Sequence, residues 1–268
     1  MMMPFVYSLS GGMLVVLATG RPEEIAWRFL RFAGLLAFAP ACAITVWSLG
    51  IPRAGGLDAP GYAPWIALAL LAGAIGVTLM APLAARAPRV FRVVCAAGGV
   101  AGLLAACATS VEPMTMHHVS VWTGAMIVVG TVLGGLMIGS ITIAWLLGHA
   151  YLTATKMTIA PLRHFSRLLT VAVGLRAAFL LVSLTVAWLG DGASDPSILT
   201  QLGRSWLVLS MRIGMGLVAV GAFALMVQGC VKLRATQSAT GILYFGSVFA
   251  YIGELASQHM LLEFGWPT

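Results

Sequence analysis

Residues 119–148 read VSVWTGAMIVVGTVLGGLMIGSITIAWLLG, a stretch without a single charged side chain. A helix needs about 20 apolar residues to cross the hydrocarbon core of a bilayer, so this stretch is long enough to do so. Long apolar stretches recur along the 268-residue chain, at about 4–20, 32–50, 62–84, 93–110, 168–190, 205–231 and 238–262, and the last three of them each contain one charged residue. The sequence therefore predicts an all-α transmembrane protein with eight spanning helices.

The composition excludes most other classes of protein. The chain is 60% hydrophobic and only 9% charged, whereas a soluble domain carries roughly 25% charged residues. Soluble enzymes, disordered chains and disulfide-rich secreted scaffolds are therefore excluded. The net charge of +7 comes from short clusters between apolar stretches, such as Arg86, Arg89 and Arg92, which is typical of membrane loops and indicates no nucleic-acid partner. None of the four cysteines forms a CxxC pair, so we interpret them as packing residues.

The distribution of basic residues predicts the orientation in the membrane. The loops after the first, third, fifth and seventh stretches carry eleven basic residues, and the opposite loops and tails carry only Arg53 and Arg204. Loops rich in lysine and arginine stay in the cytoplasm. We therefore expect both termini outside, in a multi-pass protein of the bacterial cytoplasmic (inner) membrane that contacts membrane lipid.

The two halves of the chain resemble each other in order. The segment WIALALLAGAIGVTLM at 65–80 resembles WLVLSMRIGMGLVAVG at 206–221, and SGGMLVV at 10–16 resembles LGGLMIG at 133–139. A duplicated unit of four spans gives parallel repeats related by an axis along the membrane normal. We expect two four-helix bundles in a parallel 4+4 repeat, residues 1–118 and residues 119–268.

Glycines in the fifth stretch predict close helix packing. Gly130, Gly134, Gly135 and Gly139 form two overlapping pairs spaced four residues apart. Small residues at this spacing let a neighbouring helix approach closely. We expect these contacts to lie inside the protein rather than between subunits.

Three ionisable residues fall inside spans: Arg176, Arg212 and Glu254. A charge inside a bilayer is costly and needs a partner or a water-filled cavity. Arg212 and Glu254 each lie about eight residues from the outer end of consecutive spans, at a depth of roughly 12 Å. The sequence therefore predicts that they pair, with Arg176 nearer the midplane. A structural ion pair and a ligand or proton site are both compatible with this pattern.

Other polar groups accompany Glu254 on the last span. Tyr251, Glu254 and Gln258 have helical spacing that places them on one face, and His259 follows directly. The histidines give no facing intramembrane pair for haem b. The segment MTMHH at 114–118 has ligand types that bind copper, but a four-residue cluster in a loop does not establish a metal site, and we predict none.

The segment YIGELASQHML, Tyr251 to Leu261, together with eight spans in two bundles, resembles the membrane anchors of polysulfide and dimethyl-sulfoxide reductase-type complexes. The resemblance implies a quinone-interacting subunit of a respiratory or electron-transfer complex. Glu254 would accept protons from quinol, and Arg212 would adjust the electrostatic environment of Glu254. Arg212, Tyr251, His259 and Arg176 would contribute to quinone binding. The chain would bind no redox cofactor itself and would pass electrons to protein subunits that carry such cofactors, so it would not be an enzyme alone.

Two other classes of function remain open. Parallel repeats with a buried Arg–Glu site also suit a proton-coupled or anion transporter. A structural or assembly subunit, whose charges only fix the register of the helices, is the third alternative. Stable association with haem or iron–sulfur subunits would favour the first hypothesis.

Overall fold

The computed structural model describes residues 2–49, 62–111, 121–153, 158–190, 203 and 205–266, and within these ranges every regular element is helical. The first half contains α1 (Met2–Thr19), η1 (Pro22–Glu24), α2 (Trp27–Leu49), α3 (Tyr62–Met80), η2 (Ala81–Leu83) and α4 (Pro88–Val111). The second half contains α5 (Val121–Thr153), α6 (Ala160–Gly190), α8 (Trp206–Ser210), η4 (Met211–Ala219), α9 (Val220–Lys232) and α10 (Thr236–Phe264). The elements α8, η4 and α9 follow one another without a break.

Eight helices in the described ranges are long and apolar enough to cross a membrane. This confirms the predicted number of spans and identifies the chain as a multi-pass membrane protein. The first stretch, short in sequence, forms the full helix α1. The seventh span is continuous from Trp206 to Lys232, and its middle part, η4, is a π-helix.

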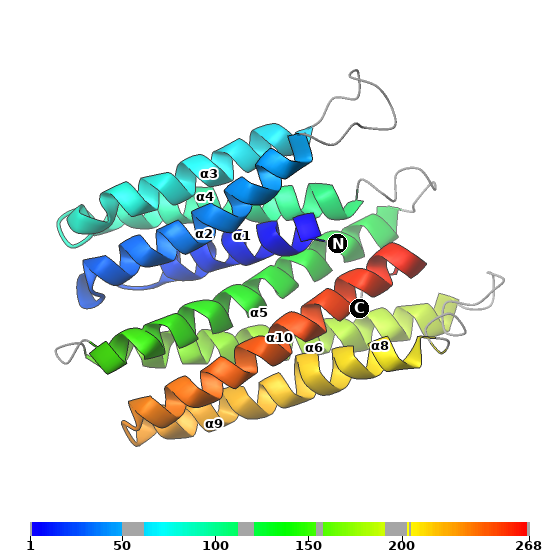
Figure 1. The fold of residues 1–268 in the computed structure, drawn as a ribbon. Helices are drawn as coiled ribbons and strands as arrows, with labels where there is room; N and C mark the ends of the chain where they lie inside the picture. Colours follow the sequence, from blue (N-terminus) through cyan, green and yellow to red (C-terminus); the bar gives the residue numbers. More distant parts are fainter. Residues whose placement is uncertain are drawn as a thin grey trace.

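The helices run side by side along one long axis (Figure 1). Helices α1 to α4 pack on one another. Helices α5, α6 and α10 form a second group with the continuous seventh span made of α8, η4 and α9. Helix α1 also packs closely on α5, so these two parallel helices join the groups. Both chain ends lie at the same end of the molecule (Figure 1).

Glycines allow the closest of these contacts. A Cβ atom on Gly12 of α1 would overlap the backbone of Gly135, and one on Gly139 would overlap the backbone of Gly12. Within the first group, a Cβ on Gly11 would lie 2.8 Å from the carbonyl carbon of Gly102. The prediction that the glycines of the fifth span pack inside the protein is confirmed.

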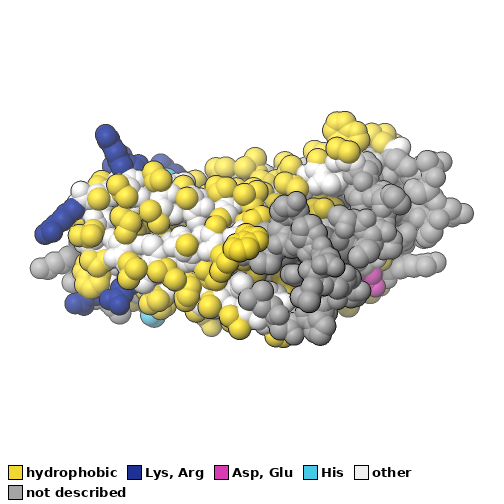
Figure 2. All heavy atoms as spheres, turned by 90° about the horizontal axis from the view of Figure 1, so that it is seen from above, with side chains coloured by type: hydrophobic (Ala, Val, Ile, Leu, Met, Phe, Trp, Pro, Cys, Tyr) yellow, Lys and Arg dark blue, Asp and Glu magenta, His cyan; other side chains and the backbone are white. Residues whose placement is uncertain are grey.

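The outer surface is apolar in the middle and basic at one end. Figure 2 shows hydrophobic side chains over the central part of one face and Lys and Arg side chains gathered at its left end. Five tryptophans near the opposite helix ends are exposed: Trp47, Trp65, Trp122, Trp188 and Trp206. An apolar band between a basic end and an aromatic end is the surface that a bilayer requires.

Several helices begin earlier than the uncharged stretches predict. Helix α4 begins at Pro88 and includes Arg89 and Arg92, and α6 begins at Ala160 and includes Arg163 and Arg167. These arginines are exposed. Because a long basic side chain can extend toward the membrane surface, a helix can carry it in its first turns without burying the charge.

Candidate functional site

The three intramembrane charges meet at one point. Arg176 on α6, Arg212 on η4 and Glu254 on α10 are each at most 2% exposed. Arg212 Nη1 lies 3.8 Å from Glu254 Oε2, which confirms the predicted pairing. Arg176 is the closer partner, because its Nη2 donates to both carboxylate oxygens of Glu254 at 3.2 Å. The site is therefore an Arg–Glu–Arg triad in which Glu254 lies between two guanidinium groups.

Further side chains fix Arg176 in place. Its Nη2 also donates to Ser257 Oγ at 3.0 Å, one turn after Glu254 on α10. Its guanidinium carbon lies 5.5 Å from the centre of the Phe179 ring on the same helix, a cation–π contact. The orientation of Arg176 is thus set by α6 and α10 together.

Glycines make room for the triad. A Cβ atom on Gly134 of α5 would overlap the carboxylate of Glu254, and one on Gly130 would lie 3.3 Å from Arg176 Nη1. On the other side, a Cβ on Gly216 of η4 would lie 2.7 Å from the Cα atom of Gly253. Gly134 and Gly216 therefore let α5 and η4 lie directly against the buried charges.

The triad has more donors than acceptors. With all three groups ionised it carries one surplus positive charge. The nitrogen atoms Nε and Nη1 of Arg176, and all three guanidinium nitrogens of Arg212, are buried without a hydrogen-bond partner. Buried polar groups are normally satisfied, and a buried charge without full compensation is costly. These nitrogen atoms are therefore donors that an acceptor group could use.

A small cavity adjoins Arg176. It has a volume of about 10 Å³, which is room for a single water molecule or a group of that size. Its polar wall contains Arg176, Glu254, Ser257 and Gln258, and the Gln258 Oε1 atom is buried without a partner. The remaining lining comes from Ile127, Gly130, Thr131 and Leu261. Arg212 is not part of this lining and approaches Glu254 from η4.

The structure does not bring every predicted residue to the triad. The hydroxyl of Tyr251 lies 2.7 Å from Thr142 Oγ1, and its ring meets Phe5 edge-on, so Tyr251 faces α5 and α1. His259 Nε2 lies 2.7 Å from Glu263 Oε2, where both side chains are about half exposed. Neither residue contacts the triad, and their predicted roles in quinone binding would require a ligand that extends beyond the cavity.

The sequence interpretation missed the site roles of Ser257, Gly134 and Thr131. Ser257 follows Glu254 by three residues, so the helical spacing alone could have found it. The sequence predicts only a packing role for Gly134. Nothing in the sequence distinguishes Thr131, which follows Gly130 on the same helix, as a site residue. Their part in the site depends on which neighbour α5 faces, and a single sequence does not provide that information.

No group of three histidine, cysteine, aspartate or glutamate residues in the described ranges lies close enough to hold a metal ion. His117 and His118 of the MTMHH segment lie outside the described residues. The absence of a haem or a metal remains a prediction.

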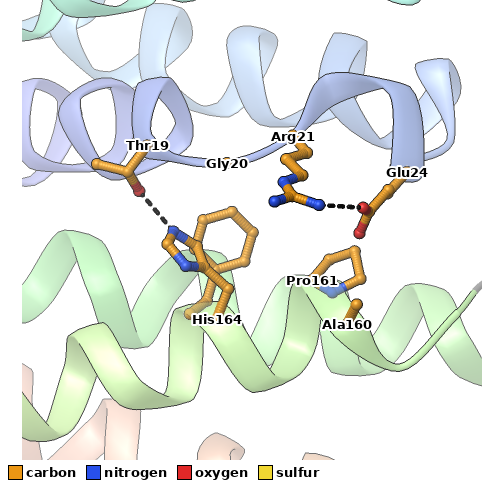
Figure 3. Close-up of a pocket in the computed structure, with 8 residues that line it drawn as sticks. Thr19, Gly20, Arg21, Glu24, Ala160, Pro161 and His164 are labelled. Atoms are coloured by element: carbon orange, nitrogen blue, oxygen red, sulfur yellow. Dashed lines mark hydrogen bonds and ion pairs between the residues drawn. The ribbon is translucent and has the colours of Figure 1, made fainter.

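A second pocket opens at the basic end, between the α1–α2 connection and the start of α6 (Figure 3). Thr19 Oγ1 lies 3.0 Å from His164 Nε2 and so links α1 to α6. Arg21 Nη1 pairs with Glu24 Oε1 at 3.2 Å, and the Arg21 side chain is 78% exposed. Because its charges already pair with each other at the surface, this pocket is a weaker candidate than the triad.

The triad, with its adjoining cavity, is therefore the candidate functional site. Comparisons with protein-family models, with curated proteins and with solved structures found no match, so the geometry alone supports the functional argument.

Proposed function

We propose that this multi-pass membrane protein is the quinone-interacting subunit of a bacterial electron-transfer complex, with the triad as its head-group site. The observation that carries the proposal is the surplus of buried guanidinium donors beside a cavity. A quinone presents carbonyl oxygens, which accept hydrogen bonds, on an apolar ring. The site offers Arg176 as a donor for one such oxygen, next to the apolar side chains of Ile127 and Leu261. Because the cavity has a volume of only about 10 Å³, the quinone ring would lie outside it.

The proposed roles follow from the contacts. Arg176 donates to the quinone oxygen through Nη1, the nitrogen that faces α5 and has no partner. Ser257 and Gln258 complete the polar wall. Glu254 holds both arginines in place, since protonation of Glu254 would leave two buried guanidinium groups without an anion. A proton-accepting role for Glu254, as the resemblance to reductase anchors implies, remains the alternative that its substitution tests.

The same proposal includes the orientation of the chain. The basic end would face the cytoplasm. The opposite end, which carries both termini and the five exposed tryptophans, would face outward, and the triad would lie in the outer half of α10. The ten basic residues of the predicted cytoplasmic loops that the structure describes are all exposed. The eleventh, Lys156, lies outside the described residues.

We also propose the parallel 4+4 repeat, on the strength of the glycine contacts. The alignment of SGGMLVV with LGGLMIG equates Gly12 with Gly135, and these two glycines touch at the α1–α5 contact. Equivalent residues meet in this way next to a two-fold axis. The contact between Gly73 and Gly98 in the first half has a counterpart in the second, between Gly216 and Gly253. Gly216 lies two residues beyond the position that the sequence alignment predicts, within the π-helix.

Direct binding of quinone tests the proposal. The purified full chain in lipid nanodiscs is titrated with ubiquinone-1 and with menadione, and binding is followed by quenching of the fluorescence of its eight tryptophans. A hydrogen bond from a charged donor contributes about 1.5–3 kcal/mol, so Arg176→Met should weaken binding about 10- to 100-fold. The matched control is Arg167→Met, on the same helix but exposed, and it should bind as the unchanged protein does.

The proposal fails if neither quinone binds saturably, or if Arg176→Met and Arg167→Met bind equally well. A properly folded variant is recognised by an unchanged elution profile and circular dichroism spectrum. Ser257→Ala, which keeps all charges, serves if Arg176→Met does not fold. It should weaken binding by a smaller factor, because Ser257 is a neutral donor.

One observation favours a second candidate function, an anion carrier. The surplus positive charge of the triad fits a substrate with a single negative charge, and charges inside a membrane often mark a transport path. Uptake of radioactive chloride into liposomes that contain the purified chain distinguishes the two candidates. A quinone-interacting subunit should give no uptake above that of empty liposomes.

A further inference from the structure

We infer that the cavity beside Arg176 binds one small monovalent anion of halide size, chloride under cellular conditions. The inference concerns the same cavity as the proposed quinone site but does not require that a quinone binds. It rests on the charge of the triad, on the unpartnered donors and on the size of the cavity, which are independent observations.

The charge of the triad requires compensation. Arg176 and Arg212 lie against one carboxylate, and Glu254 is the sole described carboxylate within ion-pair distance of either arginine. All three side chains are at most 2% exposed, inside helices that can span a membrane. In a medium of low dielectric constant an uncompensated cation is costly, whereas an anion at the same place is stabilised.

The unpartnered donors point to where the anion lies. Arg176 Nη2 is occupied by Glu254 and Ser257, but Nη1 and Nε are free and Arg176 lines the cavity. The Ser257 hydroxyl and the Gln258 side chain line it as well. A half-turn of the Gln258 amide would exchange its unpartnered oxygen for an NH2 donor. The anion would then have donors from both Arg176 and Gln258.

Glu254 also lines the cavity and would repel an anion. Its two oxygens accept from Arg176 and lie beside Arg212, so its charge is shared between two cations. Arg212 reaches Glu254 from outside the cavity lining and therefore supplies the second positive charge without filling the space. The balance of charges around the cavity is positive because of Arg212.

The size of the cavity selects the class of anion. A volume of about 10 Å³ is the space of one water molecule. A monatomic anion comes closest to this size, and chloride, which is larger than water, would enter with a small outward shift of the lining side chains. Phosphate, sulfate and carboxylates have several heavy atoms and do not fit wholly inside this volume, just as a quinone could place only one carbonyl oxygen there and not its ring. A water molecule would satisfy donors but leave the surplus charge. A cavity that holds only water would therefore give the same melting temperature in chloride and in gluconate.

The thermal stability of the purified full chain in different salts tests the inference. The melting temperature is measured in sodium chloride, sodium bromide and sodium gluconate at a fixed total salt concentration. A ligand that binds the folded state raises stability in proportion to the logarithm of its concentration. At 100 times the dissociation constant we expect a rise of about 5 °C in chloride and bromide, and none in gluconate.

Two variants separate a specific site from a general salt effect. Arg212→Met makes the triad neutral and leaves the Arg176–Glu254 pair intact, so its halide response should be lost. Arg167→Met, the exposed control on α6, should keep the full response. If Arg212→Met does not fold, Ser257→Ala should require a several-fold higher halide concentration for half of the shift.

Diffraction from crystals grown in bromide gives the direct measurement, because bromide scatters anomalously. One peak beside Arg176 Nη1 supports the inference. Equal melting temperatures in chloride and gluconate, together with no peak, would mean that the cavity holds water only and would overturn it. An equal halide response in Arg212→Met would also overturn it. If the unchanged protein binds no quinone but shows the halide response, only the proposed function is refuted and the anion site stands.

Discussion

The substitution Glu254→Gln tests the charge balance of the triad most directly. Glutamine has nearly the shape of glutamate, so the close contact with Gly134 is kept and no steric cost arises. Only the negative charge is lost. Arg176 then loses two charge-assisted bonds of 3.2 Å, and Arg212 loses its carboxylate at 3.8 Å. Breaking a buried pair in this way commonly costs about 3–5 kcal/mol.

The two arginines should differ in their contributions. Arg176→Met removes the partner whose Nη2 donates to both oxygens of Glu254 and leaves Glu254 with Arg212 beyond hydrogen-bond distance, so we expect a loss of about 3 kcal/mol. Arg212→Met removes a charge that makes no hydrogen bond to Glu254 and is in surplus. We expect its cost to be about 1 kcal/mol or less, since the Arg176–Glu254 pair remains neutral.

The assay is the free energy of unfolding of the purified chain in mixed micelles, titrated with sodium dodecyl sulfate and followed by tryptophan fluorescence. The control is Glu263→Gln, which breaks a half-exposed pair with His259 and should cost at most about 0.5 kcal/mol. If Glu254→Gln costs no more than Glu263→Gln, the view that the triad is an electrostatic unit is wrong.

Multiple substitutions refine the same test. A pair limited to Arg212 and Glu254 would be relieved by replacing both with apolar residues. Because Arg176 also binds Glu254, the combination Arg212→Met with Glu254→Leu leaves Arg176 unpaired and should not recover stability. Adding Arg176→Met removes the last charge and should recover most of it, since apolar replacement of a whole buried ion group is often neutral or stabilising.

Three further predictions concern packing, orientation and cofactor content. Gly134→Ala should destabilise the protein by about 1–3 kcal/mol in the same titration, because its Cβ would overlap the Glu254 carboxylate, whereas Gly174→Ala, with open space around it, should not. A cysteine placed at Ala87 in a cysteine-free background should resist a membrane-impermeant thiol reagent in intact cells, and labelling from outside would reverse the proposed orientation. The chain expressed alone should show no b-type band in a reduced-minus-oxidised spectrum, and such a band would show that it binds haem.

The sequence predicted the number of spans and the Arg212–Glu254 pair because both depend on position along a helix axis. A rise of 1.5 Å per residue converts sequence distance into depth. Depth does not give direction, and this matters for His259, which lies about 7.5 Å further along the helix toward its outer end than Glu254. Five residues turn an α-helix by about 500°, so His259 points about 140° away from Glu254. It meets Glu263 instead of the triad.

The role of Arg176 could not be predicted from depth alone. Its distance from the membrane surface placed it nearer the midplane, apart from the pair, yet it makes the shortest contacts with Glu254. A long arginine side chain spans more than one helical turn, so the position of the backbone does not locate its guanidinium group. The π-helix η4 adds a second obstacle, because it changes the rotational register of the residues around Arg212.

The proposed repeat suggests how a packing contact became a polar site. In the first half, Gly11 of α1 meets the backbone of α4, where a Cβ on Gly99 would lie 2.9 Å from the carbonyl oxygen of Gly11. The repeat equates Gly11 with Gly134, and Gly134 meets the carboxylate of Glu254 instead of a glycine. Gly99 and Glu254 each directly follow the glycine of an inter-helix contact, Gly98 and Gly253 respectively. The contact in the first half is between two backbones, whereas the contact in the second half is between the backbone of α5 and a carboxylate of α10. In the proposed repeat, a carboxylate on the last helix thus stands where the first half has a glycine, and Arg176 and Arg212 lie against that carboxylate.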